Sequence, residues 1–286
     1  MRILVTGVNG LVGSSLVKLL SKKNHSVLFT SRIKEYYASE KLDITNSSDV
    51  KKNISDFRPN FVINCAAMAN VDLCEVEKNL CWNINVRGVE NLVKSCINYQ
   101  CHLVHISTDY IFDGQKEGGL YLETDLPNPL GVYAKSKLEA EKKILNSQVS
   151  ASILRTILVY GNHKNPNIVT FIKNSLEDGK EVQLVEDQIR MPTFVDDLSV
   201  ACIIAGERKA KGIFNISGSE QMSYFEIGNQ IADHFSLNKK NINRVKTKDL
   251  NQKAKRPYRT GFDLTKSKNE LSFFPTKFRK ALDLIF

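Results

Sequence analysis

Short apolar runs alternate along the chain with amphipathic helical patterns, and the alternation begins at the first residues. Each run is bounded by polar or turn-forming positions, as expected of strands that are buried on both faces. The predicted strands span residues 3–6, 27–30, 61–64, 103–107 and 153–159. The helices predicted between them span residues 11–22, 50–57, 80–98 and 133–145. This order predicts an α/β fold, a doubly wound parallel sheet of the Rossmann type.

The pattern becomes less regular after residue 160, where helices are predicted near residues 169–177, 195–205 and 223–235. We interpret this part as a smaller C-terminal lobe that is assembled from excursions out of the sheet domain. The sheet domain is expected to contain residues 1–160 and 190–212. The lobe is expected to contain residues 161–189 and 213–286.

The composition is that of a globular protein, with 42% hydrophobic and 25% charged residues in a chain of 286. It contains no run of roughly eighteen apolar residues and no signal-peptide profile, so we expect a cytoplasmic protein without a membrane partner. The six cysteines form no C-x-x-C pair and have no zinc-like spacing with the five histidines. Reduced, mostly structural thiols and no metal site are therefore expected.

Positive charge is concentrated in the C-terminal part of the chain. The net charge is +9, and residues 237–286 contain fourteen Lys or Arg against four Asp or Glu. These charges occur singly or in pairs and do not form a block or a nucleic-acid module, so no nucleic-acid partner is expected. Two interpretations stay open: a solvated surface, or a lobe that attracts an anionic substrate.

A glycine-rich loop joins the first predicted strand to the first helix. Gly7, Gly10 and Gly13 have the spacing G-x-x-G-x-x-G, which permits a tight turn and a close approach of backbone N–H groups to a phosphate. The loop and the helix start, which include Asn9, Leu11 and Val12, are therefore expected to bind a dinucleotide.

The second strand decides which dinucleotide is favoured. It ends at Ser31 and Arg32, where an NAD-binding protein would be expected to have a carboxylate for the ribose hydroxyls. A guanidinium at Arg32 suits a 2′-phosphate, so NADP is favoured, with NADPH preferred over NADH. The alternative is that Arg32 is an ordinary surface arginine.

A tyrosine and a lysine four residues apart begin the helix at 133–145. Tyr133 and Lys137 share one helical face, and an ammonium beside a phenol lowers the phenol's pKa, which suits it to proton transfer. Thr108 ends the preceding strand, where it is expected to hydrogen-bond the carbonyl oxygen that Tyr133 would protonate. The pair Tyr133 and Lys137 also occurs by chance on many helices, and Thr108 could simply cap a turn.

Ordered motifs over nearly the whole chain resemble the extended short-chain dehydrogenase/reductases, and among them the dTDP-4-dehydrorhamnose reductase family. Beyond the glycine loop, Ser107 to Phe112 and Tyr133 to Lys137, the matching motifs are Asp43-Ile44, Cys65-Ala66-Ala67, Val71-Asp72 with Glu75, Asn85, Arg155-Thr156, Asp187-Gln188 with Pro192-Thr193, and Arg256-Pro257. The resemblance implies catalysis by Thr108, Tyr133 and Lys137. The implied reaction is hydride transfer from NADPH to the 4-keto group of a nucleotide-linked deoxysugar, as in dTDP-rhamnose and polysaccharide biosynthesis.

The resemblance also implies roles for further residues. Asp43 and Ile44 would lie near the adenine, Ala66 and Ala67 along the cofactor, and Asn85 in support of the cofactor and active site. The residues implied on the substrate side are Val71, Asp72, Thr108, Tyr110, Gln188 and Arg256. One departure affects the substrate: Leu158 occupies a position where rhamnose-forming members have tryptophan. The sugar, the nucleotide and a possible homodimer stay open.

Two alternatives remain for the function. A nucleotide-sugar epimerase or dehydratase would share the Tyr-Lys pair, but Arg32 and the short C-terminal lobe argue against it. A non-catalytic binding subunit, similar to the regulatory partner of methionine adenosyltransferase, would have the same fold. Binding of NADPH without turnover of any ketosugar would favour the subunit.

Overall fold

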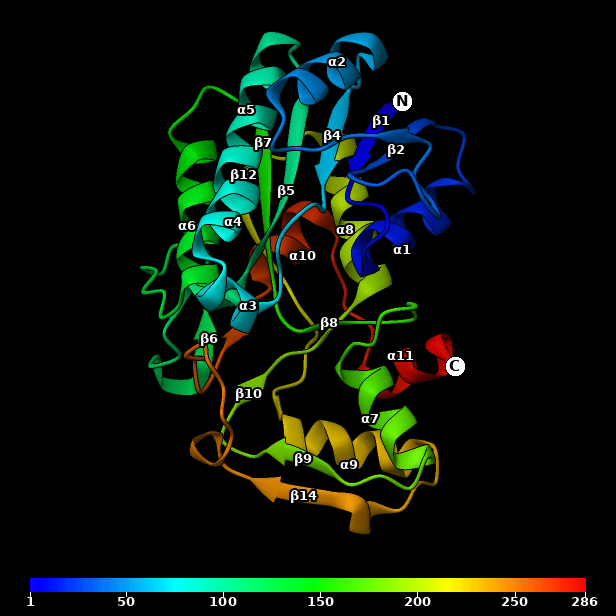
Figure 1. Cartoon of the computed structure of the whole chain (residues 1–286), viewed down its shortest axis with the longest axis vertical. Coiled ribbons are helices and arrows are strands. Elements are labelled where there is room, and N and C mark those ends of the chain that lie inside the picture. The colour runs from blue at the N-terminus through cyan, green and yellow to red at the C-terminus, as the bar shows by residue number, and fades with distance from the viewer.

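A seven-stranded parallel sheet forms the centre of the computed structural model, which describes residues 1–286 (Figure 1). The strand order is β12-β7-β5-β4-β1-β2-β3, so the chain winds outward in both directions from β1 and β4. This confirms the predicted doubly wound sheet. The strands are β1 (Arg2–Thr6), β2 (Ser26–Ser31), β3 (Glu40–Lys41), β4 (Phe61–Asn64), β5 (His102–Thr108), β7 (Ala151–Thr156) and β12 (Gly212–Ile216).

Helices cover both faces of this sheet, which explains the continuous apolar runs of its strands. One face packs against α1 (Leu11–Leu20), α8 (Val195–Arg208) and α10 (Thr265–Leu271). The other face packs against α2 (Ser47–Phe57), α5 (Gly88–Asn98) and α6 (Val132–Leu145). Alternate residues of β1 follow this division, since Ile3 and Val5 lie in the first core and Leu4 lies in the second.

The smaller lobe has its own apolar core and lies at one end of the sheet domain (Figure 1). Its helices and its parallel strand pair are α7 (Ile168–Glu177), β9 (Val182–Val185), α9 (Tyr224–His234), β14 (Ile242–Val245) and α11 (Phe278–Ile285). Short elements complete the chain: α3 (Val71–Val76), α4 (Lys78–Trp82), β6 (Leu120–Tyr121), β8 (Val159–Tyr160), β10 (Ile189–Arg190), β11 (Thr193–Phe194), β13 (Met222–Ser223) and β15 (Gly261–Phe262). None of the helices combines the length and the apolar character that a membrane crossing requires.

Several boundaries differ from the sequence prediction, and α10, which was expected in the lobe, packs on the sheet. The strand predicted over 153–159 ends at Thr156, because Leu158 has a φ of 41° and turns the chain out of the sheet into β8. The helix predicted over 80–98 consists of α4, a π-helical turn at Asn83–Arg87, and α5. Residues 213–216, which were expected in the lobe, belong to the edge strand β12. The buried polar Asn215, whose side chain donates to Tyr121 O, interrupts the apolar run of that strand.

A buried ion pair joins α6 to the sheet. Arg155 of β7 donates from Nη2 and Nε to the two carboxylate oxygens of Glu141, over 2.7 and 3.1 Å. The two side chains are only 3% and 1% exposed, so neither charge is solvated by water. Removing one partner leaves the other charge buried and uncompensated.

We therefore predict that Arg155→Met lowers the free energy of unfolding by about 3 to 5 kcal/mol, because Glu141 loses its partner. Adding Glu141→Leu should recover part of this loss, because the second change removes the stranded charge. Denaturant unfolding at pH 7 measures both effects. The control is Lys180→Met, which breaks the exposed pair with Asp178 and should change stability by no more than about 0.5 kcal/mol. Equal losses in Arg155→Met and the control would contradict the prediction.

Candidate functional site

The glycine loop packs so closely that side chains are excluded from it. Gly7 has a φ of 67°, and a Cβ there would lie 2.7 Å from the backbone N of Ala66. A Cβ on Gly13 would collide with the carbonyl oxygen of Gly7. Helix α1 begins at Leu11, and its N-cap, Gly10, makes no side-chain capping bond. The first N–H groups of α1 are therefore not occupied by a side-chain cap, an arrangement that fits a phosphate.

Two cavities of about 440 and 520 Å³ meet at this loop and share Gly7, Gly10, Cys65, Ala66 and Ala67. The larger one is also lined by Ser31, Arg32, Asp43 and Ile44, so it contains the residues expected around the adenosine. The smaller one contains Leu11, Val12 and Gly13 from the helix start. Together they form a continuous lining around the loop that suits a dinucleotide. These predicted residues are thus brought together.

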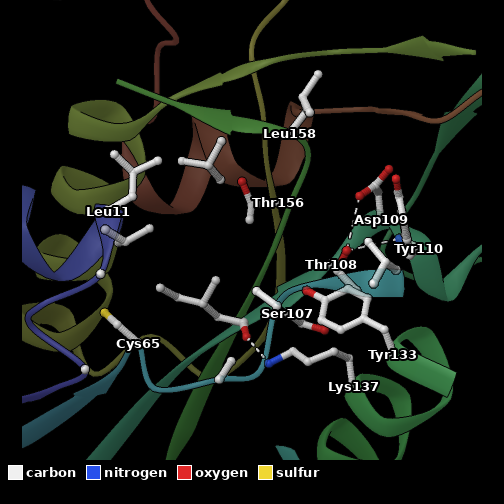
Figure 2. A pocket seen from close by; sticks show the side chains of 18 of the residues that line it. Leu11, Cys65, Ser107, Thr108, Asp109, Tyr110, Tyr133, Lys137, Thr156 and Leu158 are labelled. Carbon is white, nitrogen blue, oxygen red and sulfur yellow. Dashed lines mark hydrogen bonds between the residues drawn. The ribbon is translucent and has the colours of Figure 1, made fainter. Parts of the chain in front are cut away.

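The smaller cavity ends at the polar cluster in Figure 2, where Thr108, Tyr133 and Lys137 line the same space. Thr108 is the last residue of β5, and Tyr133 lies in the first turn of α6. Val71 and Tyr110, two of the residues expected on the substrate side, also line it. The predicted reducing centre is therefore assembled at the carboxyl end of the strands, where ligands bind in sheets of this kind.

A buried chain of hydrogen bonds runs across three strand ends to Lys137. Thr6 donates to Asn64 Oδ1 over 2.6 Å, and the backbone N–H of Ala66 donates to the same oxygen over 3.2 Å. This fixes the Asn64 amide, whose Nδ2 then donates to His105 Nδ1 over 3.1 Å. His105 Nε2 lies 3.1 Å from Lys137 Nζ.

This chain of hydrogen bonds assigns the protons of His105 and Lys137. Because His105 Nδ1 accepts, neutral His105 carries its proton on Nε2 and directs it at Lys137 Nζ. Lys137 itself donates to Ile106 O over 2.6 Å (Figure 2). Burial lowers the pKa of Lys137 to about 8, although Glu141 opposes the shift. Above pH 8 the neutral amine predominates, and it can accept from His105 and still donate to Ile106.

The pKa of Tyr133 differs from the sequence expectation. Lys137 was expected to lower it, but burial raises it above its ordinary value, and only the neighbouring Thr108 hydroxyl opposes the rise. The physical reason is that Lys137 directs its amine at Ile106 and His105 in β5. Tyr133 is consequently a neutral phenol that carries its proton at pH 7.

Thr108 is already committed to local hydrogen bonds. Its hydroxyl donates to Asp109 Oδ1 over 3.2 Å and accepts from the backbone N–H of Tyr110 over 3.2 Å. To donate to a ligand, the hydroxyl must turn away from Asp109. Asp109 is itself buried and accepts from Thr260 over 2.5 Å, so it retains a partner when Thr108 turns.

Four residues that line the cavity together with Tyr133 were not singled out from the sequence: Ser107, Asp109, Arg190 and Tyr224. Arg190 is fully buried, and its Nε has no hydrogen-bond partner, while Nη1 and Nη2 donate to Ile189 O and Pro257 O. Ser107 Oγ is also unpaired. Arg190 lies in the motif at 187–193 that the resemblance identified. A charged residue inside that motif was the sequence signal for a place in the site.

Several predicted residues do not line these two cavities. The Asn85 side chain accepts from Met68 N and donates to Met68 O and Ser136 Oγ, so it supports the chain between β4 and α6. Gln188 donates to Thr247 and Gln252 and is buried away from the cavities. Asn9 directs its amide at Ile33 O. Their expected roles toward cofactor or substrate stay predictions.

Asp72 and Arg256 bind each other. Arg256 Nη2 donates to Asp72 Oδ2 over 2.6 Å, and this contact lowers the pKa of the Asp72 carboxyl. Arg256 borders a separate hollow of about 310 Å³ that shares no lining residue with the cavity at Tyr133. The two residues expected to bind substrate thus form an ion pair. No group of three or more His, Cys, Asp or Glu side chains is placed to hold a metal ion.

The sheet, the glycine loop and the polar cluster define a class, the Rossmann-type α/β proteins with a site at the carboxyl ends of their parallel strands. Within it, the chain belongs to the family described as RmlD substrate binding domain, whose model matches residues 1–286. The resemblance inferred from the sequence motifs is confirmed.

Known proteins with two different names are similar to this chain over most of its length. The chain is 35% identical over 295 residues to the dTDP-4-dehydrorhamnose reductase of Aggregatibacter actinomycetemcomitans, with 98% of this chain and 97% of that protein covered. It is 32% identical over 273 residues to methionine adenosyltransferase 2 subunit beta of Xenopus laevis, with 93% and 81% covered. A solved structure of dTDP-4-dehydrorhamnose reductase from Bacillus anthracis, in complex with NADP, matches with a TM-score of 0.90 and 29% identity, covering 100% and 98%.

The environment of Lys137 predicts a pH-dependent difference in stability between the wild type and Lys137→Met. Above pH 8 the folded protein releases the Lys137 proton, whereas the unfolded chain keeps it until about pH 10.5. The free energy of unfolding of the wild type should therefore rise relative to the variant by up to about 1.4 kcal/mol per pH unit in this window. Denaturant unfolding between pH 7 and 9.5 measures the difference. Parallel curves for the two proteins would contradict the assignment.

Proposed function

We propose that this chain is an NADPH-dependent reductase that acts on the 4-keto group of a nucleotide-linked deoxysugar. The observation that carries the proposal is the convergence of Thr108, Tyr133 and Lys137 on a cavity that begins at the glycine loop. A reductase of this kind at 35% identity over nearly the full length supports the same conclusion. The related structure in complex with NADP supports the choice of cofactor.

The cofactor would lie along the two joined cavities. The N–H groups at the start of α1 would hold the pyrophosphate, and Asp43 and Ile44 would enclose the adenine. Arg32 would pair with the 2′-phosphate at the exposed end. Ala66 and Ala67 have small side chains, so they leave room for the dinucleotide beside the loop. When bound, NADPH supplies the hydride that reaches the carbonyl carbon of the sugar.

Tyr133 supplies the proton that the reduction consumes. A phenol with an ordinary pKa near 10 is protonated at pH 7, and burial raises this pKa further, so Tyr133 has a proton to donate to the carbonyl oxygen as that oxygen gains negative charge. Thr108 turns its hydroxyl from Asp109 to the same oxygen and stabilises the charge. Lys137 would hold the ribose beside Tyr133.

The substrate would enter between the sheet domain and the lobe. Arg190 lines the cavity, and its buried guanidinium, whose Nε lies 3.9 Å from Asp109 Oδ2 without a hydrogen bond, would attract a phosphate or sugar oxygen of the substrate. Arg256 adds positive charge nearby. It would hold the diphosphate, whether or not it stays bound to Asp72. Leu158 borders the cavity at the position where rhamnose-forming members have tryptophan. We infer that this difference sets which sugar is accepted.

The alternative of a binding subunit is favoured by one observation, the 32% identity to methionine adenosyltransferase 2 subunit beta. Such a subunit would bind the dinucleotide without turning over a ketosugar. The assembled Thr108, Tyr133 and Lys137 favour the reductase. Turnover of NADPH with a panel of nucleotide-linked ketosugars separates the two functions.

Tyr133→Phe should lower the turnover number by roughly two to four orders of magnitude, because the ring remains and the proton donor is lost. Affinity for NADPH should persist, since the glycine loop is unchanged. NADPH oxidation with a nucleotide-linked 4-ketosugar measures turnover, and fluorescence titration measures binding. Near wild-type turnover in this variant would mean that another group supplies the proton.

Arg32→Ala should remove the preference for NADPH over NADH. One charge-assisted contact to the 2′-phosphate is worth roughly 1.5 to 3 kcal/mol, so the wild type should bind NADPH more tightly by about that amount. The matched control is Lys34→Ala, which removes an exposed charge that pairs with Glu40 outside the cavities. Titrations of all three proteins with both cofactors measure the preference. Equal affinities of the wild type for NADPH and NADH would exclude this role.

A further inference from the structure

The helix that carries Tyr133 and Lys137 begins without a cap of its own. The N-cap of α6 is Gly131, which has no side chain to accept a bond from the first turn. The missing acceptor comes from α3: Glu75 Oε1 accepts from the backbone N–H of Val132 over 2.7 Å. Val132 directly precedes Tyr133, so this contact holds the backbone beside the phenol.

Gly131 provides the space for that carboxylate. A Cβ at this position would lie 2.7 Å from Glu75 Oε1 and 3.8 Å from the carbonyl oxygen of Lys255. The φ of Gly131 is −125°, which other residues adopt without strain. An alanine here would therefore displace the end of the Glu75 side chain without straining its own backbone.

The other end of α3 is tied to the C-terminal segment. Asp72 accepts from the backbone N–H of Ala254 over 2.9 Å and from Arg256 over 2.6 and 3.2 Å. Asp72 and Glu75 lie three residues apart on this short helix. One helix thus contacts the segment around Arg256 through Asp72 and the start of α6 through Glu75.

We propose that Glu75 is a positioning residue for Tyr133, and that α3 couples the segment at 254–256 to the start of the catalytic helix. The carboxylate accepts a hydrogen bond that the helix cannot satisfy itself and complements the positive end of the helix dipole. This deepens the proposed function and rests on it, since Tyr133 is taken as the proton donor. Glu75 acts through the backbone and does not touch the reacting atoms.

The first test separates positioning from binding. Glu75→Ala should lower kcat by about ten- to a hundredfold, because a displacement of the donor of the order of 1 Å has that effect on rate. The Kd for NADPH should stay within about twofold, since the glycine loop lies elsewhere. Glu75→Gln keeps an acceptor oxygen and should restore most of kcat. The control is Glu77→Ala, an exposed carboxylate next to α3 with no such contact, which should leave kcat unchanged.

The second test displaces the carboxylate without removing it. Gly131→Ala should lower kcat as Glu75→Ala does, and the double variant should be no worse than either single one, because both lose the same contact. Additive losses, or a Glu75→Gln variant as impaired as Glu75→Ala, would overturn the proposal.

A third measurement is independent of activity. Amide hydrogen exchange of residues 132–135 should be faster in Glu75→Ala and Gly131→Ala than in the wild type and Glu75→Gln, all with NADPH bound. Unchanged exchange in both variants would overturn the role of Glu75. A wild type that reduces no nucleotide-linked ketosugar would overturn the reductase proposal, and the exchange data would still decide whether Glu75 holds the start of α6.

Discussion

A buried amine needs hydrogen-bond partners, and the partners of Lys137 determine how the site is put together. Ile106 O and His105 hold it from β5, and Asn64 and Thr6 extend the chain to β4 and β1. The same Asn64 oxygen accepts from Ala66, which borders the glycine loop. The loop and α6 are therefore connected through side chains that are almost fully buried. Moving either end would leave buried polar groups unpaired.

Helix α6 is fixed at three levels by contacts of different kinds. Glu75 holds its first N–H group, Lys137 anchors its second turn to β5, and Glu141 forms the buried ion pair with Arg155 of β7. A helix with one anchor could slide or rotate along the sheet. Three anchors on separate elements leave Tyr133 a single position, which is what orientation of a proton donor requires.

The sheet and the meeting of Thr108, Tyr133 and Lys137 at one cavity were predictable because they depend on local patterns. Apolar runs located the strands, and the spacing of Tyr133 and Lys137 places them on one face of any helix. Contacts between distant segments were not predictable in this way. The buried polar Asn215 interrupts the apolar run of β12. Leu158 has a positive φ and ends β7 earlier than predicted. Arg190 reaches the cavity from a loop distant in the sequence. Likewise, the sequence did not show that Lys137 contacts His105 and Ile106 of β5. The expectation that Lys137 lowers the pKa of Tyr133 was therefore wrong.

In the proposed reaction, hydride passes to a sugar carbonyl carbon while Tyr133 gives the oxygen its proton. Its most direct test is reduction of a nucleotide-linked 4-ketosugar with NADPH that carries deuterium on the transferred position, followed by mass spectrometry and NMR of the product. We expect one deuterium bound to C4 of the sugar, and loss of this product in Tyr133→Phe. Bound NADPH with no deuterium in any nucleotide-linked ketosugar would contradict it.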